Sequence, residues 1–375
     1  MNANSEKIAS TSFFKTKSCE KKNCYFTAVD LFSGCGGLTQ GLKNAGFTVI
    51  GAIEIDSLAV ETYKDNHPGI HVWEKDIKKV SIAQVKRILN LKSGELDLLA
   101  GCPPCQGFSM MRTLNGNKTV EDPRNELVFE FLRFVRGLRP KAIMMENVPG
   151  LASDIRIVQL CNELTTLGYT YRLKILNAAE YGVPQRRYRM ILLGSRFGPV
   201  DFAPVDRERK TVRQTIGYLQ KPGRSGDSIH DLPEKRKKSV MDIIQKIPRD
   251  GGSRRDLGKD RQLDCHKKCD GFKDVYGRMA WDDVSPTITS GCVNPSKGRF
   301  LHPEQDRAIT LREAALLQSF PSNYRFSLKR GKYRVAVMIG NALPPEFIKR
   351  HANQIYIFLK AKQNCKRKSK QKGVS

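Results

Sequence analysis

The 375-residue sequence has no apolar run close to the roughly 20 residues that a membrane-spanning helix needs. Its N-terminus is polar and lacks the apolar core and cleavage site of a secretory signal, so we expect a cytoplasmic protein without a membrane partner. Ten cysteines without such a signal argue against a disulfide framework. The Cys and His spacing is too loose for zinc, even in the cluster of Cys265, His266, Cys269 and Cys292. We therefore expect no metal.

Negative charge is also scarce. The chain has 38 Asp and Glu against 65 Lys and Arg, which gives a net charge of +27 and an isoelectric point near 9.8. Such a field favours a polyanionic partner, with nucleic acid as the leading candidate. A basic tail on a protein with another task explains only part of the excess, because residues 361–375 contribute +6 and leave +21 elsewhere.

Short apolar runs alternate with helical patterns up to about residue 195. The runs typical of strands are 25–32, 47–55, 71–73, 96–100, 141–145, 172–176 and 189–193. Amphipathic patterns predict helices at 38–45, 57–66, 81–91 and 123–138. Strands that are apolar on both faces and separated by helices imply a doubly wound α/β fold with a mostly parallel sheet. Ligands of such folds bind at the carboxyl ends of the strands.

The composition changes near Phe197. From 198 to 300 the chain is rich in Gly, Pro, Arg and Lys, although 275–281 and 286–290 look like strands, so we predict a smaller, loop-rich domain. A disordered insert is the alternative. The expected organisation is a flexible segment at 1–24, a main domain at 25–197, the small domain at 198–309, a hinge at 310–333, a return to the main domain at 334–360 and a disordered basic tail at 361–375.

A glycine-rich segment, Asp30-Leu31-Phe32-Ser33-Gly34-Cys35-Gly36-Gly37-Leu38, follows the first predicted strand. Glycines at such a junction let the backbone turn tightly and approach a ligand, although many α/β proteins use them only for packing. Glu54 ends the next strand, 20 residues after Gly34, where a carboxylate can accept hydrogen bonds from ribose hydroxyls. Asp76 ends the third strand and could meet an adenine amino group or simply cap a helix. Together these residues predict an adenosine-containing cofactor.

A second segment, Gly101-Cys102-Pro103-Pro104-Cys105-Gln106-Gly107-Phe108-Ser109, follows the strand at 96–100. Paired prolines fix the backbone direction, so the Cys105 thiol would be held rigidly at the ligand-binding edge. Since the thiolate is the reactive form, such a site needs neighbours that lower the thiol pKa. Cys102 completes a Cys-x-x-Cys pair, but the following residues do not open a helix directly, as in a redox dithiol. We therefore assign Cys102 a structural role.

Charged side chains accompany two further strands. Glu146, in Met145-Glu146-Asn147-Val148-Pro149, could protonate or hydrogen-bond a heterocyclic nitrogen, or cap a helix instead. Arg187 and Arg189, in Gln185-Arg186-Arg187-Tyr188-Arg189, lie on one face of a strand because side chains alternate. Two guanidiniums beside a thiol and a carboxyl suit an electron-rich carbonyl oxygen and a phosphate; a solvated basic strand is the alternative.

The ordered segments DLFSGCGGL, GCPPCQGFS, MENVPG, QRRYR and GNALPP closely resemble those of the DNA (cytosine-5) methyltransferases, over residues 25–360 and in the family's order. GNALPP departs from the usual GNAVPP only at Leu343. The resemblance implies a Rossmann-like catalytic domain, a target-recognition domain at 198–309 and S-adenosyl-L-methionine as cofactor. The cofactor pocket that it implies consists of Phe32, Gly34, Cys35, Gly36, Gly37, Glu54, Asp76, Pro104 and Asn341.

The resemblance also implies the chemistry. Cys105 would attack C6 of a cytosine flipped out of duplex DNA, while Glu146 engages N3 and the exocyclic amine. Arg187 would hold O2, Arg189 would orient Arg187 or its neighbours, and C5 would take the methyl group. Residues 108–123 would form a mobile loop that closes over the DNA. The expected partners are double-stranded DNA and a cognate restriction endonuclease acting on the same site, for a monomer associated with the nucleoid.

Two other functions remain open. An RNA cytosine-5 methyltransferase would use the same core, but the basic, Gly- and Arg-rich region 198–300 favours duplex DNA. A catalytically inactive DNA-binding regulator is less compatible with the joint presence of Cys105, Glu146, Arg187 and Arg189. Candidates for DNA contacts in the small domain are Arg254, Arg255, Lys273, Arg278 and Lys297.

Overall fold

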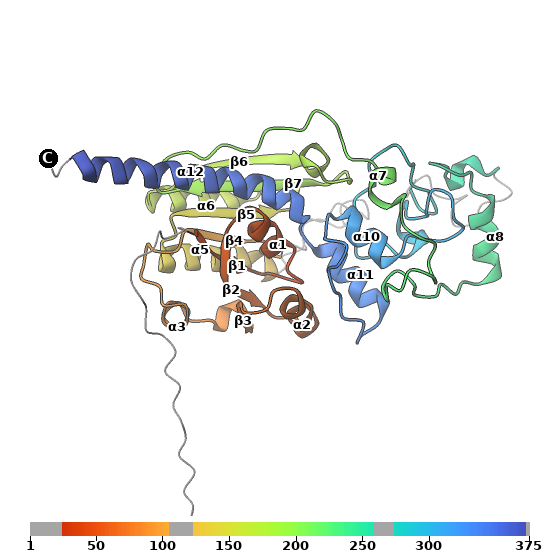
Figure 1. Ribbon diagram of the computed structural model, residues 1–375, viewed down its shortest axis with the longest axis horizontal. Helices are drawn as coiled ribbons and strands as arrows, with labels where there is room; N and C mark the ends of the chain where they lie inside the picture. The colour runs from red at the N-terminus through yellow and green to blue at the C-terminus, as the bar shows by residue number, and fades with distance from the viewer. Residues whose placement is uncertain (1–24, 105–122, 259–273, 373–375) are drawn as a thin grey trace, which may run out of the picture.

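The structure, a computed structural model, describes residues 25–104, 123–258 and 274–372, with side chains described as far as 365. The expected flexible segment 1–24 and nearly all of the expected loop 108–123 lie outside these ranges, as do Cys105 and Lys273. A seven-stranded sheet occupies one half of the molecule, and a loop-rich helical unit occupies the other (Figure 1). No helix in the described ranges is long and apolar enough to cross a membrane.

The sheet has the strand order β3-β2-β1-β4-β5-β7-β6. Its strands are β1 (Thr27–Leu31), β2 (Thr48–Glu54), β3 (His71–Glu74), β4 (Leu98–Gly101), β5 (Ala142–Asn147), β6 (Thr170–Asn177) and β7 (Tyr188–Ser195). Neighbours from β3 to β5 pair in parallel, whereas β7 is antiparallel to both β5 and β6. The predicted strands and the doubly wound, mostly parallel class are confirmed. The central strands form apolar runs because both of their faces are buried.

The loops after β1 and β4 diverge at the centre of the sheet. The chain runs from β1 outward through β2 to β3, and then returns to place β4 on the other side of β1. This is the topological switch point at which doubly wound folds form their ligand crevice. Because β7 is reversed, its first residues lie at the same edge: Met190 pairs with Asn147 at the carboxyl end of β5, and Tyr188 pairs with Asn177 of β6.

Helices cover both faces of the sheet (Figure 1). On one face, α1 (Gly37–Asn44) packs against α12 (Pro345–Lys372), and both contact the sheet through side chains such as Leu42 and Phe347. The other face carries α3 (Ile82–Ile88), α5 (Leu127–Leu138) and α6 (Ile155–Thr166). Next to β2 and β3 lies α2 (Ser57–Asn66).

The second unit has its own apolar core. Side chains of α7 (Val212–Ile216), α10 (Leu311–Leu317) and α11 (Lys332–Asn341) pack in it together with side chains from the loops between them. A smaller cluster lies under α8 (Lys238–Lys246). Short 3-10 turns occur at Ile77–Lys79, Pro123–Glu126, Pro149–Ser153, Ala178–Tyr181, Arg254–Asp256 and Pro295–Lys297.

Three expectations for the C-terminal half are wrong. Residues 275–281 and 286–290 form no strands, because their backbone groups bind scattered partners and not one neighbouring strand. The Met279 N–H donates to the Leu301 carbonyl oxygen, for example, and the Ile288 N–H donates to the Gln185 side chain. Residues 334–339, where the return to the main domain was expected to begin, belong to α11 and pack in the core of the second unit. The chain therefore returns to the sheet only near Leu343. The basic tail is helical as far as Lys372, since its Lys, Gln and Ala residues favour continuation of α12.

Candidate active site

The glycine-rich segment leaves β1 at the central crevice. Phe32 and Gly34 have positive φ angles of 61° and 54°, so the chain turns sharply directly after the strand. Phe32 is half-buried against the apolar core on the α5 side of the sheet. Apart from the chain neighbours of Gly34, no atom of the described residues lies within 4 Å of the place where a Cβ of Gly34 would stand. The backbone at Gly34 is therefore open to a ligand.

Gly36 and Gly37, in contrast, are tightly surrounded. A Cβ on Gly36, which has φ 96°, would stand 2.6 Å from the Tyr324 hydroxyl, and one on Gly37 would stand 2.5 Å from the Leu343 carbonyl oxygen. The Tyr324 hydroxyl also donates to the carbonyl oxygen of Cys35 at 2.6 Å. Residues far along the chain thus hold the glycine-rich loop from behind, a contact that no local pattern predicts.

The two carboxylates expected at the cofactor have different surroundings. Glu54 Oε2 accepts the Gly34 N–H at 2.8 Å, and its Oε1 accepts the amides of the next two residues. Glu54 is therefore fixed beside the glycine-rich loop. Asp76 accepts the Lys78 N–H at 3.0 Å and caps a 3-10 turn, as its alternative reading predicted. Burial raises the pKa of the Cys35 thiol to about 12, so this side chain packs in its neutral form.

Glu146 is 1% exposed at the carboxyl end of β5. Its Oε1 lies 2.9 Å from Arg189 Nε, and its Oε2 accepts the Cys102 thiol at 2.8 Å. The contact with Arg189 is an ion pair rather than an aligned hydrogen bond, so Oε1 has no hydrogen-bond partner among the described residues. Burial raises the pKa of Glu146 despite the opposing effect of Arg189, and this favours the protonated carboxyl that can donate to a ring nitrogen.

Arg187 directly precedes β7 and is 3% exposed. Its Nη1 donates to the Ile288 carbonyl oxygen at 3.1 Å, and its Nη2 donates to those of Gly340 and Ala342 at 3.2 and 3.3 Å. Arg187 Nε has no hydrogen-bond partner among the described residues. Burial lowers the pKa of the guanidinium, and Glu146 opposes that effect. Carbonyls from two segments therefore fix Arg187 and leave its Nε–H for a ligand oxygen.

The two arginines share one side of the chain, as predicted, because the exposed Arg186 and Tyr188 alternate with them. Glu146 pairs with Ile191 across the β5–β7 ladder, so Arg189 is a diagonal neighbour of Glu146 on the same face. The reversal of β7 thus brings the basic segment to the acidic one.

The Pro-Pro turn and the segment around Asn341 complete the edge. Pro104 is the last described residue before Cys105, which lies outside the described ranges. Asn147 Nδ2 donates to the Pro103 carbonyl oxygen at 2.9 Å and ties this turn to β5, a role that the sequence reasoning missed. Asn341 is exposed at the end of α11, between Gly340 and Ala342, whose carbonyl oxygens both bind Arg187.

The model of the C-5 cytosine-specific DNA methylase family matches residues 26–356. The chain belongs to this family. It is a DNA (cytosine-5) methyltransferase, with the activity predicted from its ordered segments.

Its relatives include methyltransferases of restriction-modification systems. The chain is 36% identical over 330 residues to the Type II methylase M.HgiDII of Herpetosiphon aurantiacus, covering 84% of this chain and 91% of the relative. It is 34% identical to the Type II methyltransferase M1.HphI of Haemophilus parahaemolyticus, with 85% and 83% covered. Among solved structures, a DNA modification methyltransferase encoded within an E. coli prophage has a TM-score of 0.64 at 25% identity, covering 90% of this chain and 100% of that one. The Rossmann-like class is thereby confirmed.

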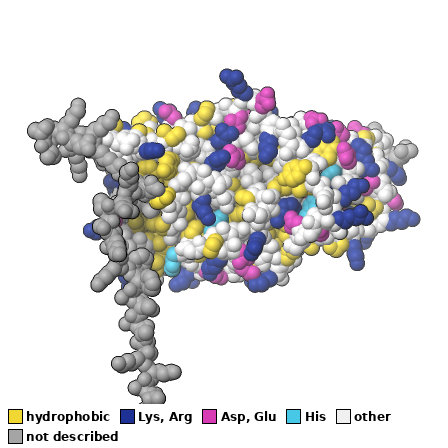
Figure 2. Space-filling view, viewed as in Figure 1, with side chains coloured by type: hydrophobic (Ala, Val, Ile, Leu, Met, Phe, Trp, Pro, Cys, Tyr) yellow, Lys and Arg dark blue, Asp and Glu magenta, His cyan; other side chains and the backbone are white. Residues whose placement is uncertain are grey.

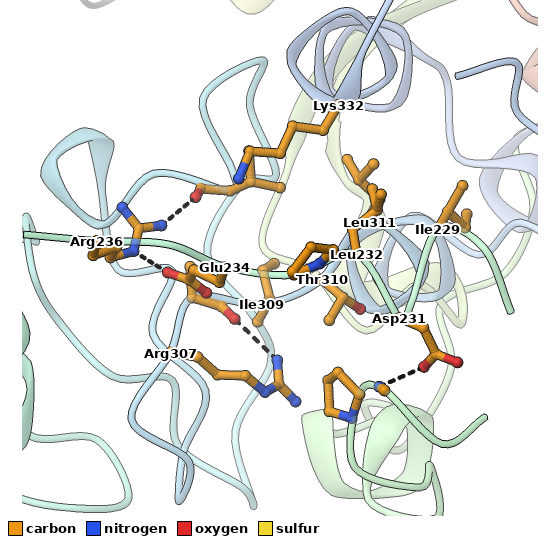
Figure 3. Close-up of a pocket in the computed structure, with 15 residues that line it drawn as sticks. Ile229, Asp231, Leu232, Glu234, Arg236, Arg307, Ile309, Thr310, Leu311 and Lys332 are labelled. Carbon is orange, nitrogen blue, oxygen red and sulfur yellow. Dashed lines mark hydrogen bonds and ion pairs between the residues drawn. The ribbon is translucent and has the colours of Figure 1, made fainter. Parts of the chain in front are cut away.

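The methyltransferase also has a cavity of about 270 Å³ in its second unit, lined partly by Ile229, Leu232 and Ile309 (Figure 3). Two of the three cations at its wall are already engaged, since Arg307 pairs with Glu313 and Arg236 pairs with Glu234. None of the predicted site residues that the structure describes lines this cavity. The cavity is therefore separate from the predicted site residues at the sheet edge.

Two of the candidates for DNA contacts are too buried to make them. Arg278 and Arg254 are buried, whereas Arg255 and Lys297 are exposed. Arg278 donates to carbonyls of Ile244, Ile247, His302 and Gln305 and pairs with Asp306, so it organises the second unit. On the face shown in Figure 2, Lys and Arg side chains lie among Asp and Glu over both halves of the molecule.

Proposed function

We propose that this enzyme transfers a methyl group from S-adenosylmethionine to C5 of a cytosine flipped out of a specific duplex DNA sequence, through a covalent bond between Cys105 and C6. The observation that carries the proposal is the pairing of Glu146 with Arg189 beside Arg187, at the sheet edge where the glycine-rich loop opens. Cys105 follows the last described residue of that edge.

The residues around the crevice fit the proposed cofactor. Gly34 is open, the Glu54 carboxylate is fixed beside it, and Ser33 Oγ and Asp30 Oδ1 are buried without a hydrogen-bond partner among the described residues. A hydroxyl- and amine-bearing ligand could use these groups. Phe32 would contact the adenine, Glu54 the ribose and Asp76 the adenine amino group, with the Gly34–Gly37 backbone, Pro104 and Asn341 completing the pocket. When bound, the sulfonium supplies an electrophilic methyl group.

The proposed reaction begins with attack on the cytosine ring by a thiolate and with a hydrogen bond or proton donated to the same ring. The Cys105 thiolate forms a bond to C6, while Glu146 donates a proton or hydrogen bond to N3 and accepts one from the exocyclic amine. Arg187 Nε donates to O2 and offsets the charge that develops on the ring. C5 would then take the methyl group as the bond from that methyl to the sulfonium sulfur breaks, with a neutral thioether as the leaving group. Loss of the C5 proton to a base would restore the ring double bond as the Cys105–C6 bond breaks.

Bisulfite sequencing of DNA from cells that express the protein would test whether the product is 5-methylcytosine and would reveal the target site. The purified enzyme should then form a complex, stable to denaturant, with that site carrying 5-fluorocytosine, because fluorine cannot leave as the C5 proton does. Cys105→Ser should form no such complex. Cys365→Ser, at an exposed cysteine, is the matched control and should behave as wild type. An adduct formed by Cys105→Ser would refute the nucleophile.

We further propose that the second unit reads DNA and that the enzyme protects the site of a cognate restriction endonuclease. The names of the Type II relatives and the net charge of +27 support both statements. Methyl transfer should be measured on duplex DNA and on tRNA. Transfer to RNA alone would favour the RNA alternative, and no transfer to either would favour the inactive regulator.

A further inference from the structure

The Cys102 thiol lies against the carboxyl group of Glu146. It donates to Oε2 at 2.8 Å from the end of β4, the strand next to β5. Cys102 is half-buried among apolar side chains, and burial raises its pKa well above the ordinary value, so the thiol keeps its hydrogen. A protonated thiol is a hydrogen-bond donor, and this one has an acceptor in the reaction site.

The two carboxyl oxygens of Glu146 are therefore not equivalent. Oε2 is capped by the thiol, whereas Oε1 faces Arg189 at 2.9 Å and has no hydrogen-bond partner among the described residues. A carboxyl group rotates freely about its last torsion unless something fixes it. The thiol on one side and the guanidinium on the other fix the plane of this group, and they leave Oε1 with unused hydrogen-bonding capacity.

We infer that Cys102 is a positioning residue, which holds the Glu146 carboxyl in the rotation that presents Oε1 to the target base. The inference rests on the proposed role of Glu146. It replaces the purely structural role expected for Cys102 from the sequence. Only the Sγ–H can act in this way, since the contact is made by the tip of the side chain.

The charged groups around Glu146 determine how the loss of the Cys102 hydrogen bond would change the pKa of Glu146. Arg189 on β7 and Arg187 before β7 lower the pKa of Glu146, and the hydrogen bond from Cys102 after β4 lowers it too. Replacing Cys102 by alanine removes one lowering effect and leaves both arginines. The pKa of Glu146 should then rise, so the protonated carboxyl should persist to higher pH in Cys102→Ala than in wild type.

The experiment compares single-turnover methylation rates across pH for wild type, Cys102→Ala and Cys102→Ser. Cys102→Ala should be slower by about tenfold, which corresponds to the loss of one hydrogen bond that positions the carboxyl group. Its alkaline limb, where Glu146 loses its proton, should lie at higher pH. Cys102→Ser retains a donor and should recover most of the rate and the wild-type limb. Cys161→Ala, a buried cysteine on α6, is the matched control for a lost sulfur.

Two outcomes would overturn the inference: a wild-type profile in Cys102→Ala, or a rate lowered equally at every pH and not restored by serine. The second result would indicate a cavity and not a lost donor. Glu146→Gln separates this inference from the proposed function. If Glu146→Gln keeps the full rate, the proposed role of Glu146 fails; if it is inactive while Cys102→Ala is normal, only the role of Cys102 fails.

Discussion

Gln185 and Gln318 form a fully buried amide pair, in which Gln185 Nε2 donates to Gln318 Oε1 at 2.8 Å. Gln185 Oε1 accepts the Ile288 N–H at 2.8 Å, and Gln318 Nε2 donates to the Ile339 carbonyl oxygen at 2.7 Å. The pair thus connects the approach to β7 with α10 and α11. The segments that it joins are those whose carbonyls bind Arg187.

Gln318→Ala should therefore reduce both stability and activity. The change leaves one buried N–H of the Gln185 amide without its acceptor, at a cost of about 1–3 kcal/mol. It also removes the shorter of the two hydrogen bonds to the Ile339 carbonyl oxygen, which keeps the Ala342 N–H at 3.3 Å. The urea midpoint should fall, and kcat should fall because the carbonyls around Arg187 lose their support. Gln159→Ala, at an exposed position on α6, should change neither. A normal urea midpoint in Gln318→Ala would show that water replaces the amide.

Tyr324→Phe should weaken cofactor binding without weakening DNA binding. The lost hydroxyl donates to the Cys35 carbonyl oxygen at 2.6 Å and contacts His67 Nε2 at 3.0 Å, so it fixes the glycine-rich loop from outside the cofactor crevice. Loss of one such hydrogen bond costs about 1 kcal/mol, or roughly fivefold in affinity for S-adenosylmethionine. Calorimetric titration measures this change, and a gel-shift assay measures DNA affinity. Tyr333→Phe, at an exposed tyrosine, is the control.

The sheet could be predicted from the sequence because burial on both faces leaves apolar runs with few polar interruptions. Residues 96–100 and 141–145 are examples. The direction of β7 could not be predicted, since the reversal depends on how its connection crosses the sheet and not on the residues of the strand. For that reason Arg189 could be assigned to a suitable face of its strand from the sequence, but its pairing with Glu146 could not be predicted.

The second unit could be predicted only from its change in amino-acid composition, and its internal structure could not. Many of its backbone groups form hydrogen bonds with residues that are distant in sequence. The Arg278 guanidinium, for example, donates to four carbonyl oxygens, and such contacts leave no periodic pattern in the local sequence. An arginine in a basic region was interpreted as a DNA contact because exposure is the common state of arginine. The link from Cys102 to Glu146 was missed for a similar reason, because 44 residues separate the two side chains.

Arg278→Met should destabilise the second unit more than it affects cofactor affinity. The guanidinium is fully buried, and its removal leaves four carbonyl oxygens and the Asp306 carboxylate without this donor. Each buried group that is left without a hydrogen-bond partner costs about 1–3 kcal/mol, whereas Asp306 keeps its pair with Arg249. Proteolysis within 198–309 should accelerate, while binding of S-adenosylmethionine to the sheet half should be nearly unchanged. Arg255→Met, at an exposed arginine, is the control. Equal protease resistance in the two variants would contradict the structural role.

DNA affinity should fall steeply with ionic strength. With 65 Lys and Arg against 38 Asp and Glu, binding should displace counterions from several phosphates. A plot of log affinity against log salt should have a slope of about −0.9 for each phosphate contacted. A Lys297→Ala variant should lower the slope by about one if its exposed ammonium meets a phosphate. A flat plot for wild type would exclude the use of the basic charge in DNA binding.

Asp30→Asn should gain stability relative to wild type as pH rises. Burial, with a smaller contribution from Glu54, raises the pKa of Asp30 to about 7, although the Thr39 hydroxyl donates to its Oδ2 at 2.7 Å. Between the ordinary value of 3.8 and about 7, the unfolded chain loses this proton and the folded chain keeps it, so wild type loses stability through that window. Asparagine has no proton to lose. Urea unfolding of cofactor-free protein at about pH 5 and about pH 8 should show a relative gain of a few kcal/mol for the variant. An offset between the two proteins that is the same at both pH values would mean that Asp30 is ionised in the folded state, paired with a group beyond those that surround it here.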